Sequence, residues 1–144
     1  MPATAGCPQD IFHGQPGKYA VTDKILLASG DSPLLERAGR VLADQEYQVC
    51  PFVDGINALI GVVNHRPDLI FVDTLLPRLT AHQFCYLVKR NAEFRPVPVI
   101  ILSNTNGLAE RAKGHSVGAI YQLVKPFDDQ ELLKVTRRYM TICP

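Results

Sequence analysis

Residues 69–73 read LIFVD, which is four apolar residues followed by a carboxylate, Asp73. A short, continuous apolar run bounded by polar residues is typical of a strand that is covered on both faces of a parallel sheet. Four more runs of this kind occur along the chain: ILLA (25–28), QVCPF (48–52), VPVIIL (97–102) and IYQLV (120–124). The sequence therefore predicts five buried strands, one of which ends at Asp73.

Segments with helical spacing of apolar residues separate these runs. We expect helices after Pro33, after the N-cap candidates Asp54 and Thr80, over residues 106–116 and from about Asp128. Strands and helices that alternate with short connections predict an α/β fold. Right-handed crossovers then give a doubly wound, five-stranded parallel sheet with five helices on its two faces.

Length and composition limit the classes of protein to consider. The 144 residues carry a formal net charge of +1, which argues against a domain that binds nucleic acid through bulk positive charge. No apolar stretch is long enough to cross a membrane, and residues 1–10 do not resemble a secretory signal, so we expect a cytoplasmic protein. Residues 1–22 are rich in Pro and Gly and are interpreted as an N-terminal extension, either poorly ordered or packed on the surface, before one domain over 23–141.

Three polar residues follow three of the predicted strands. Asp73 ends one strand, Ser103 ends the run VIILS, and Lys125 follows YQLV. The carboxyl ends of parallel strands meet at one edge of the sheet, where ligand chemistry collects. A carboxylate there can accept a phosphoryl group, an ammonium can balance the developing charge, and a hydroxyl can donate a hydrogen bond. We therefore expect a phosphoacceptor site formed by these three residues.

The motifs resemble those of the response-regulator receiver domains of two-component signalling. They are LIFVDTLLP (69–77), VIILS (99–103) and GAIYQLVKPF (118–127), and the likeness covers about residues 23–140. The resemblance implies a flavodoxin-like strand order 2-1-3-4-5, phosphorylation of Asp73, and a cis peptide before Pro126. The stretches 77–94 and 107–118 are most similar to receivers of pilus-dependent and gliding motility.

The resemblance also implies a function and a set of partners. We expect a single-domain response regulator that is a phosphoacceptor protein and not an enzyme, beyond catalysing its own phosphoryl transfer. Its partners would be a sensor histidine kinase or phosphotransfer protein and a downstream target protein, which could belong to motility, with no nucleic acid and no membrane. The signal would pass through the face made by the fourth helix, fifth strand and fifth helix.

The predicted metal site departs from the family pattern. Receivers hold Mg²⁺ with two acidic residues after the first strand, but the matched positions here are Ser29 and Gly30. Two alternatives remain for Asp31, which is one place further on: it turns toward Asp73, or it caps the following helix. The resemblance then leaves Asp73, Asp31 and the backbone carbonyl of Leu75 as metal ligands, and we expect weak Mg²⁺ binding.

Two more departures leave a second function open. Gln122 stands where receivers usually carry an aromatic switch residue, and Thr80-Ala81 replaces a pair that usually ends in glycine. The alternative function is a phosphorylation-independent pseudo-receiver that acts as an interaction module. A flavodoxin-like cofactor binder has little support, because the expected strand-end loops lack a Ser/Thr/Gly-rich phosphate cradle.

Overall fold

The computed structural model describes residues 23–140 and contains a five-stranded parallel sheet. The strands are β1 (Lys24–Ala28), β2 (Gln48–Phe52), β3 (Leu69–Asp73), β4 (Val99–Ser103) and β5 (Tyr121–Val124). Their order is β2-β1-β3-β4-β5, which confirms the predicted fold class and strand order. The proposed extension over residues 1–22 lies outside the described residues.

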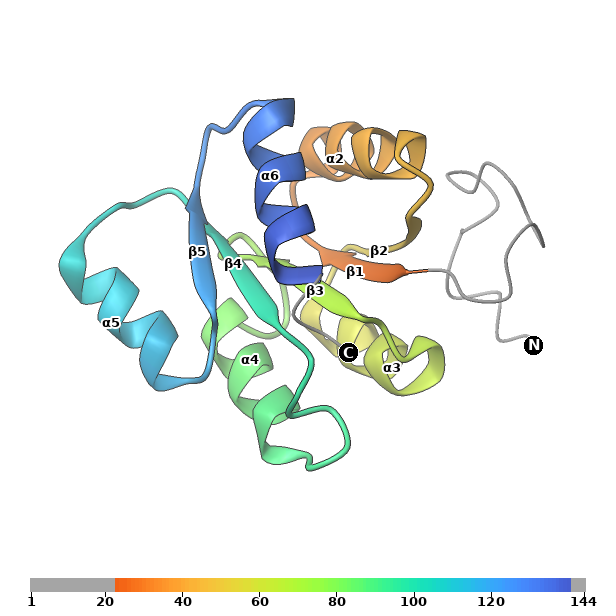
Figure 1. Ribbon diagram of the computed structural model, residues 1–144. Coiled ribbons are helices and arrows are strands. Elements are labelled where there is room, and N and C mark those ends of the chain that lie inside the picture. Colours follow the sequence, from red (N-terminus) through yellow and green to blue (C-terminus); the bar gives the residue numbers. More distant parts are fainter. Residues whose placement is uncertain (1–22, 141–144) are drawn as a thin grey trace.

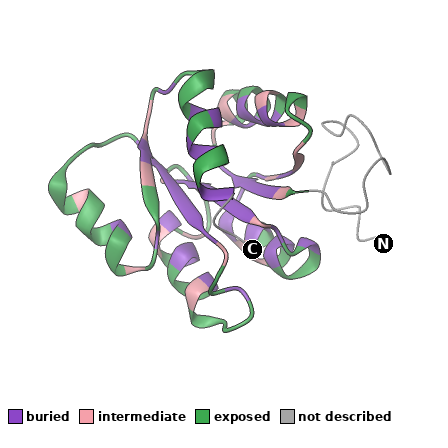
Figure 2. Ribbon diagram, in the orientation of Figure 1, coloured by how far each residue is buried: buried purple, intermediate pink, exposed green. Residues whose placement is uncertain are grey.

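Five helices cover the two faces of this sheet (Figure 1). On one face lie α2 (Ser32–Asp44) and α6 (Asp129–Met140), and on the other α3 (Gly55–His65) and α4 (Ala81–Arg90), with α5 (Leu108–Ser116) beside β5. Alternate strand residues point to opposite faces and form two apolar clusters, one centred on Ile70 and Ile101 and the other on Phe71 and Leu102. Strands β1 to β4 are accordingly mostly buried, whereas the edge strand β5 and the outer faces of the helices are more exposed (Figure 2).

Side-chain hydrogen bonds cap several of these helices, and two of the caps are the predicted residues Asp54 and Thr80. Asp54 accepts a hydrogen bond from the backbone N–H of Asn57 at 2.8 Å, and this bond is the main cause that lowers the pKa of its carboxyl group. Thr80 and Gln83 form a reciprocal capping box at the start of α4. Both predicted N-caps are confirmed. By contrast α5, which was expected over residues 106–116, begins after Gly107 without a side-chain cap.

One smaller expectation is met directly after β5. The peptide bond between Lys125 and Pro126 is cis, as the resemblance implies. Over residues 23–140, no helix is long and apolar enough to cross a membrane. Asp73 ends β3, Ser103 ends β4 and Lys125 directly follows β5, so the three predicted site residues lie at one edge of the sheet.

Candidate phosphoacceptor site

Asp73 lies at the carboxyl end of the central strand β3 and has no solvent-exposed surface. Its Oδ1 accepts a hydrogen bond from Lys125 Nζ at 2.7 Å, across the ends of β3, β4 and β5. The Lys125 side chain is itself only 11% exposed. A buried carboxylate requires a partner of this kind, because an unpaired charge in the interior is very costly. The structure thus brings two of the three predicted residues into contact.

Ser29, immediately after β1, binds the other carboxylate oxygen. Its Oγ lies 2.6 Å from Asp73 Oδ2, and Ser29 has no exposed surface. The same Oγ accepts a hydrogen bond from the backbone N–H of Asp31 at 2.9 Å. In the sequence, Ser29 is distinguished only as a position that lacks the expected acidic side chain. The signal that could have revealed its role is a small hydroxyl residue at a strand end beside the strand of Asp73.

Ser103, the third predicted residue, does not bind Asp73 in this structure. Its buried Oγ accepts a hydrogen bond from the backbone N–H of Thr105 at 3.1 Å and lies 3.2 Å from the carbonyl oxygen of Thr105. This local turn holds the loop between β4 and α5. The role of Ser103 in phosphoryl transfer stays a prediction.

Asp31 follows the second of its two predicted alternatives. Its carboxylate accepts a hydrogen bond from the backbone N–H of Leu34 at 3.3 Å and caps α2, as is common for an aspartate at this position. The carbonyl oxygen of Leu75 accepts a hydrogen bond from the N–H of Gly30 at 2.6 Å. Two of the three predicted metal ligands therefore have other hydrogen-bond partners here.

These contacts show that the donor set fits Mg²⁺ poorly. Mg²⁺ needs hard oxygen ligands that are free to complete an octahedron, and it gives up its own water reluctantly. Among the described residues, no group of three or more acidic, His or Cys residues could hold a metal ion. The carboxylate of Asp73 is fully buried and is already balanced by the charge of Lys125. The assignment of Asp73, Asp31 and the Leu75 carbonyl as ligands stays a prediction of weak binding.

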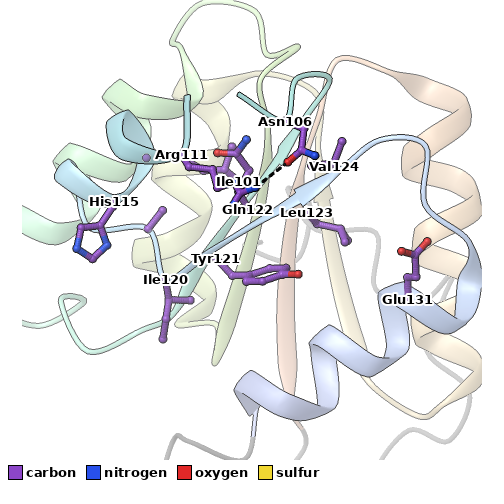
Figure 3. Close-up of a pocket in the computed structure, with 12 residues that line it drawn as sticks. Ile101, Asn106, Arg111, His115, Ile120, Tyr121, Gln122, Leu123, Val124 and Glu131 are labelled. Atoms are coloured by element: carbon purple, nitrogen blue, oxygen red, sulfur yellow. Dashed lines mark hydrogen bonds between the residues drawn. The ribbon is translucent and has the colours of Figure 1, made fainter. Parts of the chain in front are cut away.

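Gln122, in place of the usual aromatic residue, lies on β5 and points into a pocket between α5, β5 and α6 (Figure 3). Its Nε2 donates a hydrogen bond to the carbonyl oxygen of Thr105 at 3.0 Å, while its buried Oε1 has no hydrogen-bond partner within residues 23–140. Its neighbour Tyr121 is 40% exposed and packs against the ring of Tyr139. The loop after β4, which contains Thr105, is therefore linked to β5 by a side-chain hydrogen bond.

A family model described as the response regulator receiver domain matches residues 25–137. The chain belongs to the response-regulator receiver family. It is therefore a response regulator of two-component signalling, and its domain is a signalling domain and not a classical enzyme. This membership favours the first of the two predicted functions over the pseudo-receiver.

Individual relatives agree with this assignment. The receiver is 35% identical to the protein PilG of Pseudomonas aeruginosa over 117 residues, which are 81% of this chain and 87% of PilG. It is 32% identical to the response regulator MprA of Mycobacterium sp. (strain KMS) over 76% of this chain, but spans only 47% of MprA. The likeness to PilG is consistent with the predicted similarity to pilus-motility receivers.

Solved structures confirm the fold. The chemotaxis protein CheY4 of Vibrio cholerae superposes with a TM-score of 0.79 at 28% identity, over 83% of this receiver and 99% of CheY4. The receiver domain of the sensor histidine kinase PA1611 from Pseudomonas aeruginosa has a TM-score of 0.77 at 26% identity, over 84% of this chain and 99% of that one. That structure holds a magnesium ion in its active-site cleft.

Proposed function

We propose that this receiver accepts a phosphoryl group on Asp73 in a phosphorelay. The observation that supports the proposal is the buried ion pair between Asp73 and Lys125 at the end of the central strand. A carboxylate held in place by an ammonium is a prepared nucleophile, and the same ammonium can shift to the phosphoryl oxygens when they arrive. The donor would be a sensor histidine kinase or a phosphotransfer protein.

The surroundings of Lys125 indicate from which side the donor approaches. A groove of about 430 Å³ lies between the start of α2 and the end of β5, lined by Asp31, Arg37, Asn104 and Lys125 among others. Lys125 contributes to this groove, whereas Asp73 is fully buried behind it. The long, flexible lysine side chain can move aside, so we place the entering phosphoryl group on the Lys125 side of Asp73, at Oδ1.

We propose further that the signal leaves through the face made by α5, β5 and α6. The support is the link from Ser103 through Thr105 to Gln122, whose side chain points into the pocket on this face. A phosphoryl group on Asp73 would compete for the Ser103 hydroxyl and loosen this link. The partner would be a protein of the same signalling pathway in the cytoplasm, and the likeness to PilG favours a motility pathway.

The phosphoacceptor proposal is tested by adding a small phosphodonor and measuring the intact mass of the protein. The wild type should gain one phosphoryl group, and Asp73→Asn, which keeps size and polarity but removes the nucleophile, should gain none. Mg²⁺ should bind only weakly, as the donor set indicates. A wild type that gains no phosphate with any donor, with or without Mg²⁺, would contradict the proposed function.

A further inference from the structure

The Ser29 hydroxyl has its hydrogen-bond direction fixed by its surroundings. The backbone N–H of Asp31 donates to Ser29 Oγ, so the hydroxyl proton is directed elsewhere. Asp73 Oδ2 lies 2.6 Å away, and an ionised carboxylate only accepts. Ser29 is therefore a donor to Asp73, and a short one, as is usual for a hydroxyl bound to a charged oxygen.

The two oxygens of Asp73 divide their partners unequally. Oδ1 accepts from Lys125 Nζ at 2.7 Å and from the backbone N–H of Leu75 at 3.1 Å. Oδ2 accepts from Ser29. One positive charge and two neutral donors thus satisfy one negative charge. A divalent cation placed at Oδ2 would have to share that oxygen with the Ser29 hydroxyl and would leave the buried site with an excess of positive charge.

We propose that the Ser29 hydroxyl does at Asp73 Oδ2 what a metal ion does in a receiver that binds one, so that phosphorylation of Asp73 does not require Mg²⁺. This inference rests on the proposed phosphoacceptor function. Ser29 touches the reacting carboxylate and so takes part in the transfer itself. Ser29 directly follows β1, at the same sheet edge as Asp73, so its hydroxyl is in position before the reaction begins. A donor that is already in position does not have to reorganise during the transfer.

The transfer can be written with its bonds balanced. A lone pair on Asp73 Oδ1 attacks the phosphorus of a phosphohistidine or phosphoramidate, and an O–P bond forms. The P–N bond breaks, and its electron pair leaves on the donor nitrogen, which is protonated by solvent. The ammonium of Lys125 passes from Oδ1 to the phosphoryl oxygens, which now carry the negative charge. Oδ2 becomes the carbonyl oxygen of the acyl phosphate and keeps its hydrogen bond from Ser29.

The test measures the rate of phosphorylation by phosphoramidate in Mg²⁺ and in EDTA, read by intact mass. The wild type should react at similar rates in both. Ser29→Ala should react about tenfold to a hundredfold more slowly in both, the factor expected when a hydrogen bond to a charged oxygen is lost. Ser32→Ala is the matched control on the exposed first turn of α2 and should react like the wild type.

The Mg²⁺ affinity of Ser29→Asp can be measured without the phosphorylation reaction. A carboxylate at this position faces Asp73 directly, and two adjacent carboxylates favour a divalent cation. Titration with Mg²⁺ followed by NMR should show saturable binding in Ser29→Asp that is much tighter than in the wild type. Its phosphorylation should be slow in EDTA and restored by Mg²⁺.

The outcomes separate this inference from the proposed function. A wild type that is phosphorylated in Mg²⁺ but at least about tenfold more slowly in EDTA overturns the role of Ser29 and leaves Asp73 as phosphoacceptor. A rate for Ser29→Ala equal to that of the wild type does the same. A wild type that is not phosphorylated in either condition contradicts the proposed function itself. Thermal unfolding of Ser29→Ala shows whether it is folded; if it is not, the wild-type comparison decides.

Discussion

The two sides of Asp73 differ in how closely they keep to the pattern of their family. On the β5 side, Lys125 binds Oδ1 and occupies the place that the motif predicts. On the β1 side, Ser29 stands where an acidic residue is expected, and its hydroxyl binds Oδ2. The β5 side therefore supplies the charge of the site, and the β1 side supplies a neutral donor. Under the proposed function, this receiver keeps the aspartate that accepts the phosphoryl group, although Ser29 and Gly30 stand at the positions of the family's acidic pair.

The largest effect on stability should come from the β5 side. Lys125→Met leaves the buried carboxylate of Asp73 without its counter-charge and should lower the free energy of unfolding by about 3–5 kcal/mol. Urea unfolding followed by circular dichroism measures this value. Lys134→Met, on the exposed face of α6, is the matched control and should change it little.

A double mutant sharpens this result. Once Asp73→Asn has removed the negative charge, Lys125→Met should cost much less than it does in the wild type, because the two residues form one pair. Equal costs in the two backgrounds would show that the loss comes from packing of the lysine stem and not from the ion pair.

A smaller effect is expected on the β1 side. Ser29→Ala removes a donor to Asp73 Oδ2 and the acceptor of the Asp31 N–H, and should lower the free energy of unfolding by about 1–3 kcal/mol. The same unfolding experiment measures it, with Ser32→Ala as reference. If Ser29→Ala were as stable as the wild type, the hydrogen bond to Asp73 would not be part of the site in solution.

The smallest effect concerns Asp31, and two substitutions separate its alternative roles. Asp31→Ala removes the cap of α2 and should cost about 1 kcal/mol, whereas Asp31→Asn keeps a good cap and should cost almost nothing. Neither should change the weak response of the protein to Mg²⁺ in an NMR titration. Loss of Mg²⁺ binding in Asp31→Asn would show that Asp31 is a metal ligand after all.

The fold could be predicted because its signals are local. Each strand is a short apolar run, and residues such as Asp54 and Thr80 begin helices through hydrogen bonds to their own next turn. The position of Asp73 beside Lys125 also followed from the sequence, since parallel strands bring their carboxyl ends together. Patterns of this kind need no knowledge of side-chain direction.

The details of the site could not be predicted, because they depend on which way individual side chains point. The sequence could not decide between two orientations of Asp31, nor show that Ser103 bonds to its own loop and not to Asp73. Gly30 is the second position at which receivers carry an acidic residue, so an aspartate there would be expected to strengthen metal binding. In the structure, a Cβ atom on Gly30 would lie 2.9 Å from Cδ of Pro77, so that substitution is strained and Ser29→Asp is the better choice.

The site of phosphorylation can be located directly on the chain. After reaction with phosphoramidate, reduction with borohydride converts a phosphorylated aspartate to homoserine, which peptide mass spectrometry identifies by position. We expect homoserine at position 73 in the wild type, in Mg²⁺ and in EDTA alike, and none in Asp73→Asn. Homoserine at another aspartate, or its absence from position 73 in a protein that has gained a phosphoryl group, would contradict Asp73 as the phosphoacceptor.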